Sequence, residues 1–143
     1  MHDYLASLIP WGVQAVLWVQ QVASPVLDSV FRMVSTLGLP HVYVGVLLAV
    51  YWCAHKPAAR SLAYIFVFSE YANGVIKDTF GLPRPYDVDL RVRAPWPEAT
   101  LSFPSRHAQA AIVFWGTLAK TLRRRWAWLS ALALVLGISF SRI

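Results

Sequence analysis

The stretch RSLAYIFVFSEYANGVIK, from Arg60 to Lys77, is an apolar run that contains one carboxylate and ends on a lysine. A carboxylate in such a run is costly inside a membrane and normally faces the interior of a helix bundle. Glu70, Asn73 and Lys77 are spaced three and four residues apart, so they share one face of a helix. Two interpretations of this face stay open: it positions Lys77 for binding, or it is a polar packing contact between helices.

Three further apolar segments cover residues 41–54, 107–122 and 126–140. Each is shorter than the ~20 residues of a typical membrane span, but their aromatic ends suit a membrane interface. Hydrophobic residues make up 57% of the chain and charged residues 14%, whereas an average soluble domain is ~25% charged. The mean hydropathy is +0.49. We therefore predict an all-α, multi-pass membrane helical bundle; a soluble helical protein with a large core is the alternative.

The N-terminal part of the sequence has a different pattern. Ser24 followed by Pro25 predicts a helix start, with serine as the N-cap and proline in the first turn. After it, apolar residues share one helical face, and the opposite face is polar. The apolar face comprises Val26, Leu27, Val30, Phe31, Val34 and Leu37. We predict amphipathic, interfacial helices over residues 1–38 and the membrane core over residues 39–143.

The basic residues predict how the chain is oriented. If all four apolar segments cross the membrane, HKPAAR (55–60) and RRR (123–125) lie on one side, and the loop 78–106 lies on the other with Lys77 and Arg142. The short, dense basic turns favour the cytoplasm for the first side. We therefore predict a multi-pass protein of the cell (inner) membrane whose second side is extracytoplasmic.

The charge also indicates the kind of partner. The formal net charge is +6, but the basic residues form short clusters between apolar runs. We therefore expect membrane lipids or a phosphate ligand as partners and no nucleic acid. A homo-oligomer is left open.

Several polar side chains on the second side suit a phosphate ligand. Lys77 ends its segment, Arg84 follows in a proline-stiffened loop, and FPSRHAQ (103–109) begins the next helix with Ser105 as the expected N-cap. A helix N-terminus beside an ammonium and guanidinium groups can bind a phosphoryl group without a metal or other cofactor. His107, in the first turn, can give a proton to a leaving oxygen. The candidate phosphate ligands are Lys77, Arg84, Ser105, Arg106 and Arg142.

These residues stand in motifs that resemble a known family. KDTFGLPRP fits K-x6-R-P, PSRH is close to P-S-G-H, and the SR of Ser141–Arg142 begins S-R-x5-H-x3-D. In this order the motifs resemble those of the type-2 phosphatidic acid phosphatase family, which shares its site with vanadium haloperoxidases. The resemblance covers roughly residues 25–143. It implies a helical membrane phosphatase that acts without metal on lipid phosphate monoesters or pyrophosphates. Lys77, Arg84 and Arg142 would bind phosphate, Ser105 would donate a hydrogen bond to it, and His107 would be the general acid.

The sequence departs from the family pattern in two places. Arg106 replaces the family's glycine, and this arginine either crowds the phosphate or adds a cation. The sequence ends at Ile143, before the third motif's histidine, the nucleophile of a phosphohistidine mechanism, and its aspartate. We therefore expect residues 39–143 to be a phosphatase-like core, incomplete at its C-terminus and weakly active or inactive. The alternatives are a non-catalytic membrane protein that binds phosphate headgroups and a haloperoxidase-like enzyme that uses vanadate.

Overall fold

The computed structural model describes residue 7 and residues 9–21, 24–93 and 101–141, and all regular structure in these ranges is helical. This finding confirms the all-α prediction. The helices are α2 (Ile9–Gln20), α3 (Pro25–Thr36), α4 (Pro40–Cys53), α5 (Lys56–Phe80), α6 (Pro85–Val88), α7 (Arg106–Leu122) and α8 (Arg125–Phe140).

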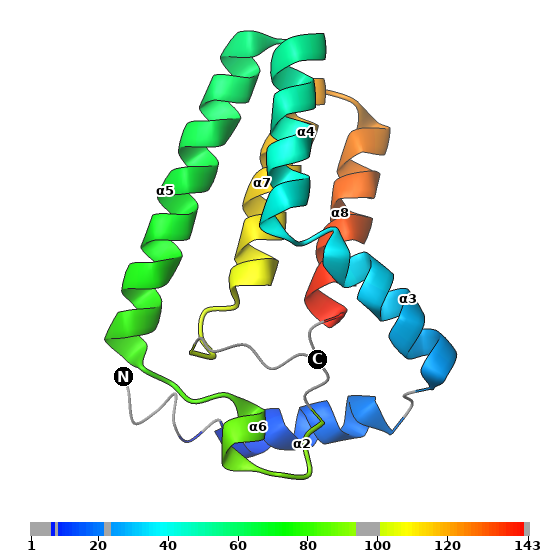
Figure 1. Cartoon of the computed structure of the whole chain (residues 1–143), viewed down its shortest axis with the longest axis vertical. Coiled ribbons are helices and arrows are strands. Elements are labelled where there is room, and N and C mark those ends of the chain that lie inside the picture. Colours follow the sequence, from blue (N-terminus) through cyan, green and yellow to red (C-terminus); the bar gives the residue numbers. More distant parts are fainter. Residues whose placement is uncertain (1–6, 8, 22–23, 94–100, 142–143) are drawn as a thin grey trace.

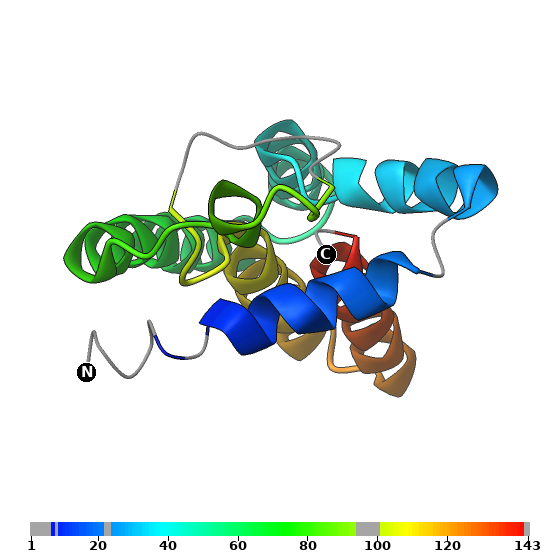
Figure 2. The same ribbon diagram turned by 90° about the horizontal axis from the view of Figure 1, so that it is seen from below.

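Four of these helices form an upright bundle (Figure 1). Helix α7 packs against both α5 and α8, and α4 packs against α5. Helix α3 leaves the bundle at an angle and contacts α8, whereas α2 crosses below the bundle beside α6 (Figures 1 and 2). The α4–α5 and α7–α8 turns lie at one end of the bundle, and the end of α5, α6 and the beginning of α7 lie at the other (Figure 1). The two turns thus lie at the end of the bundle opposite the beginning of α7 (Figure 1).

The helices begin and end where local chemistry favours it. Ser24 caps α3 as predicted, and its Oγ accepts a hydrogen bond from the Leu27 N–H at 3.2 Å. Ser105 is the N-cap of α7, also as predicted. Helix α5 ends at Gly81, which has φ of +59° and donates its N–H to the Lys77 carbonyl at 2.9 Å. That left-handed conformation favours glycine, so it stops α5 directly after its lysine-bearing turn.

The core lies where α4, α5 and α7 meet. Tyr43, Leu62, Ala110 and Phe114 are buried together. The Tyr43 and Phe114 rings pack with centroids 4.8 Å apart, within the range for favourable aromatic pairs. Between α7 and α8 the buried residues are alanines, so these two helices approach closely.

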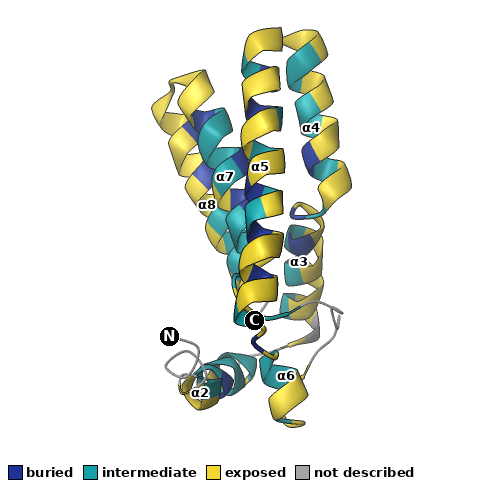
Figure 3. Cartoon of the chain, turned by 90° about the vertical axis from the view of Figure 1, so that its left-hand side faces the viewer, coloured by how far each residue is buried: buried dark blue, intermediate teal, exposed yellow. Residues whose placement is uncertain are grey.

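The outer faces of the bundle are exposed (Figure 3), and many of the exposed side chains are large and apolar. On α5 alone, large apolar or aromatic side chains are mostly exposed: Tyr64, Val67, Phe68 and Tyr71. Exposed apolar surface on this scale marks contact with lipid or with another protein.

The described helices are short or interrupted by polar residues compared with a membrane span of ~20 apolar residues. Among the described residues, no single helix is both long enough and apolar enough to cross a membrane. The pair Val26–Thr36 and Pro40–Cys53 meets the requirement together but bends by 49° at its junction. The multi-pass architecture and the division at residues 38–39 therefore stay predictions.

The bend between α3 and α4 is closely packed at Gly38. A Cβ atom added there would lie 2.9 Å from Ile138 Cγ2 and 3.1 Å from His107 Cδ2. The bend therefore contacts both α8 and the first turn of α7.

Candidate functional site

A cavity of about 410 Å³ lies between the last turns of α5 and the beginning of α7. Its lining residues are Glu70, Asn73, Gly74, Lys77, Asp78, Leu101 and Arg106. The lining thus combines two cations with two carboxylates, and most of it comes from one face of α5.

Lys77 is the buried cation of this cavity. It is 7% exposed, and its Nζ donates a hydrogen bond to the Leu101 carbonyl at 2.7 Å. The chain after Leu101 is tied to the end of α5 by the Ser102 N–H, which donates to the Leu82 carbonyl at 2.9 Å. The Lys77 ammonium is therefore held beside the segment that leads into α7.

Arg106 is the second cation and the first residue of α7. It is exposed at the surface. The positive charges of Arg106 and Lys77 both interact electrostatically with the Glu70 carboxylate. The Ser105 Oγ accepts the Ala108 N–H at 3.4 Å, so it satisfies one of the free N–H groups of the helix start. The N-terminus of α7 and two cations thus meet at one place, which suits an anion.

A polar network joins α5 to α7 behind the cavity. The Asn73 Nδ2 donates to Gln109 Oε1 at 2.8 Å. The Gln109 Nε2 donates to the Ser69 carbonyl at 2.9 Å and to the Ser69 Oγ at 2.8 Å. For Asn73, the structure therefore supports the interpretation as a polar contact between helices. The hydrogen bonds between Ser69 and Gln109 were not predicted from the sequence. The available signal was that both are polar residues within apolar helices.

His107 faces a different part of the protein. It is buried, and it does not line the cavity. Its ring lies against Gly38 in the α3–α4 bend. Lys77 and His107, which the sequence assigned to one site, therefore lie on different sides of the α7 N-terminus.

Arg84 is also not among the cavity residues. Its guanidinium carbon lies 5.9 Å from the centroid of the Tyr86 ring, and its backbone N–H donates to Asp87 Oδ2 at 3.2 Å. Arg142 lies outside the described residues. The structure thus brings Lys77, Ser105 and Arg106 to one end of the bundle, and the roles of all five phosphate ligands stay predictions.

The loop after α6 carries an ion pair. Arg91 donates to the Asp89 carboxylate at 2.7 Å. Hydrogen bonds from the Arg91 side chain, followed by one from its backbone N–H, lower the pKa of Asp89 from 3.8 to about 2. Both residues therefore have partners within the loop.

Comparisons with known proteins agree with the motifs. The sequence model described as the PAP2 superfamily matches residues 58–143, which include every residue of the cavity. Dihydrosphingosine 1-phosphate phosphatase of Saccharomyces cerevisiae is 29% identical over 99 residues, which are 64% of this chain and 24% of that protein. The chain thus spans about a quarter of the length of this curated relative. No solved structure matches the chain.

Proposed function

Because the chain belongs to the PAP2 superfamily, we propose that it binds the phosphate of a lipid phosphate monoester or pyrophosphate for metal-independent hydrolysis. The observation that carries the proposal is the meeting of Lys77, Arg106 and the α7 N-terminus at one cavity. The yeast relative is a phosphatase of dihydrosphingosine 1-phosphate, a lipid phosphate monoester, and this supports the same substrate class.

The proposed chemistry begins with a phosphate bound over the N-terminus of α7. Free N–H groups there and the two cations would neutralise its oxygens through charge-assisted hydrogen bonds. A phosphate oxygen would take the place of the Leu101 carbonyl as acceptor for Lys77, which already points to this segment.

His107 is the proposed general acid. Consecutive residues leave a helix about 100° apart, so Arg106 and His107 diverge on either side of the α7 start. Because His107 does not line the cavity, this role requires the phosphate to lie over the helix end, between the cavity and the His107 side of α7. His107 would then give a proton to the leaving oxygen.

The membrane location is part of the proposal. The exposed apolar faces of the bundle and the lipid substrate of the relative support a protein of the cell membrane. We propose that the cavity is extracytoplasmic, because the basic turns lie at the opposite end of the bundle (Figure 1).

Cysteine labelling in intact cells tests this orientation. In a Cys53→Ala background, Leu90→Cys and Ala54→Cys place single thiols at exposed positions near opposite ends of the bundle. We expect an impermeant reagent to label Leu90→Cys alone. Labelling of Ala54→Cys alone would reverse the orientation.

The binding proposal is tested with phosphate or vanadate on the purified chain in detergent. Hydrogen bonds to charged groups contribute ~1.5–3 kcal/mol, so Lys77→Ala should weaken binding by about 10–150-fold. Arg106→Gly should also weaken binding if this arginine is an additional cation, whereas tighter binding would show that it crowds the ligand. Arg60→Ala, at the far end of the same helix as Lys77, is the control. Unchanged affinity in both Lys77→Ala and Arg106→Gly would refute the phosphate site.

Turnover is measured in a chain extended to include the third motif, because the resemblance places the nucleophile there. Phosphate release from a lipid phosphate should fall ~10²–10⁴-fold in His107→Ala, the usual contribution of general acid catalysis. Phosphate binding without release by this extended chain would favour the alternative, a membrane protein that only binds phosphate headgroups.

A further inference from the structure

Two buried polar groups beside the cavity have complementary hydrogen-bonding needs. The Tyr43 hydroxyl on α4 and the Glu70 Oε1 on α5 are both buried, and within the described part of the chain neither has a hydrogen-bond partner. The two groups interact electrostatically. A buried tyrosine hydroxyl usually finds an acceptor, and a buried carboxylate oxygen is costly without a donor. Each group could therefore satisfy the other.

The Tyr43 ring is held in place against the face of α5 that carries Glu70. Its centroid lies 5.1 Å from that of Phe66 on α5 and 4.8 Å from that of Phe114 on α7. Phe66 and Glu70 are four positions apart, so they share one face of the helix. The packed ring keeps the hydroxyl where it is, whereas the Glu70 carboxylate can turn about its side-chain bonds. Glu70 is therefore the group that can change its partner.

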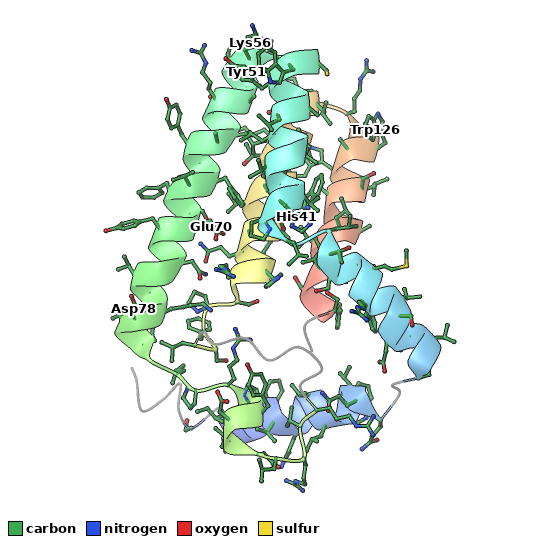
Figure 4. All side chains as sticks on the ribbon, in the orientation of Figure 1. His41, Tyr51, Lys56, Glu70, Asp78 and Trp126 are labelled. Atoms are coloured by element: carbon green, nitrogen blue, oxygen red, sulfur yellow. The ribbon has the colours of Figure 1, made fainter. Side chains whose placement is uncertain are left out.

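The cations of the cavity compete with Tyr43 for this carboxylate. Glu70 lines the cavity together with Lys77 and Arg106, and both of their charges interact with it. Figure 4 shows the Glu70 side chain on the side of α5 that faces the bundle. A bound phosphate would need the same two cations for its own oxygens. The carboxylate and the phosphate thus compete for the same positive charge.

We propose that Glu70 is a positioning residue of the phosphate site that changes its partner when phosphate binds. Without phosphate, its carboxylate neutralises Lys77 and Arg106. With phosphate bound, it turns to the Tyr43 hydroxyl and accepts a hydrogen bond from it. The inference rests on the proposed phosphate site and adds the way in which its affinity is set: Tyr43 removes the cost of a buried, unpaired carboxylate once the cations are taken.

The affinity test uses inorganic phosphate, titrated against the full chain in detergent. Glu70→Gln should tighten binding roughly 10-fold, the effect of one unit charge about 10 Å away near a protein surface. Tyr43→Phe keeps the ring but should weaken binding ~10-fold or more, the effect of one hydrogen bond to a charged group. In the double variant, Tyr43→Phe should have no effect on affinity, because the neutral amide does not compete with phosphate for the cations.

Two control variants separate this exchange from a general effect of charge or of a lost hydroxyl. Asp78→Asn also removes a carboxylate from the cavity wall, but Asp78 is exposed and can turn to water. It should tighten phosphate binding, and Tyr43→Phe should still weaken binding in its background. Tyr71→Phe removes a hydroxyl from an exposed side chain of α5 and should leave the affinity unchanged.

A spectroscopic measurement follows the exchange in the wild-type chain itself. Tyrosine is labelled with ¹³C at Cζ, the carbon that carries the hydroxyl, and the Tyr43 signal is assigned by its absence in Tyr43→Phe. Phosphate should shift this signal in the wild-type chain, because its hydroxyl gains a charged acceptor. The same addition should leave it unshifted in Glu70→Gln.

The outcomes distinguish this inference from the proposed function. Weaker phosphate binding in Glu70→Gln would overturn it, because Glu70 would then hold the cations ready for phosphate. Equal effects of Tyr43→Phe with and without the Glu70 carboxylate, or an unmoved Tyr43 signal, would also overturn it. Binding that depends on Lys77 would leave the phosphate site standing in each of these cases. Failure of the wild-type chain to bind phosphate would overturn this inference and the proposed function together.

Discussion

Replacing Gly38 by alanine tests whether the α3–α4 bend is held by close packing. The added Cβ would lie 2.9 Å from Ile138 Cγ2, 3.1 Å from His107 Cδ2 and 3.3 Å from the Ser35 carbonyl oxygen. Real Cβ atoms essentially never come within 3.0 Å of a heavy atom, so something must shift. None of the three neighbours can move easily. Ile138 and His107 are buried side chains, and the third neighbour is the backbone carbonyl oxygen of Ser35.

The expected loss of stability follows from two opposing contributions. Overpacking of this kind costs ~1–3 kcal/mol. Replacing glycine restricts the unfolded chain and returns ~0.4–1 kcal/mol. The net effect should be a decrease of ~0–2.6 kcal/mol in the free energy of unfolding.

Thermal or denaturant unfolding of the purified protein in detergent measures this difference. Gly45→Ala is the matched control, because Gly45 lies within α4 and an added Cβ there would meet nothing within 4 Å. Alanine is favoured over glycine in a helix interior by ~0.5–1 kcal/mol, so this control should be slightly stabilised. Equal stability of the two variants would show that the bend is not closely packed.

Two further predictions concern hydrogen bonds and charge. A double-mutant cycle of Asn73→Ala and Gln109→Ala should give a coupling of ~0.6 kcal/mol, the average between membrane helices, and at most ~1.7 kcal/mol. As a control, Thr121→Ala takes the place of Gln109→Ala in the cycle. The Thr121 hydroxyl donates to the Thr117 carbonyl within α7, so this second cycle should give no coupling. NMR titration should place the pKa of Asp89 near 2 and return it toward 3.8 in Arg91→Ala. Because the folded pKa is the lower one, the pair's contribution is complete above the unfolded value and is lost as the pH falls through about 2. An Asp89 pKa near 3.8 in the wild-type chain would contradict the ion pair.

The helices and their starts could be predicted from the sequence because they depend on local features. Apolar runs mark α4, α5, α7 and α8, and Ser24 and Ser105 act as caps on residues three positions away. Such interactions are complete within one turn, so the sequence alone specifies them. The bounds of α5 were predicted less well: the apolar run covers Arg60 to Lys77, whereas the helix begins at Lys56 and continues to Phe80, where Gly81 ends it.

Contacts between distant segments could not be predicted in the same way. The pairing of Gln109 with Ser69 depends on how α5 and α7 are rotated against each other, which no local pattern determines. Arg84 was expected beside Lys77 because the two share a motif. After Gly81 the chain turns into α6, and the Arg84 guanidinium lies over the Tyr86 ring. A motif fixes the distance along the chain but not the direction in which a loop turns.

The amide pair between α5 and α7 also determines how far these helices can slide along each other. Between apolar helix faces in lipid, sliding by one turn changes little, because lipid chains are as apolar as the side chains they replace. A slip of one turn, ~5.4 Å, in the direction that raises α5 along α7 would instead set Asn73 opposite Val113, an apolar residue four positions after Gln109. Asn73, which is 1% exposed, would then lose its acceptor. Asn73 and Gln109 therefore give the two helices a single register, and with it a fixed distance between the end of α5 and the beginning of α7.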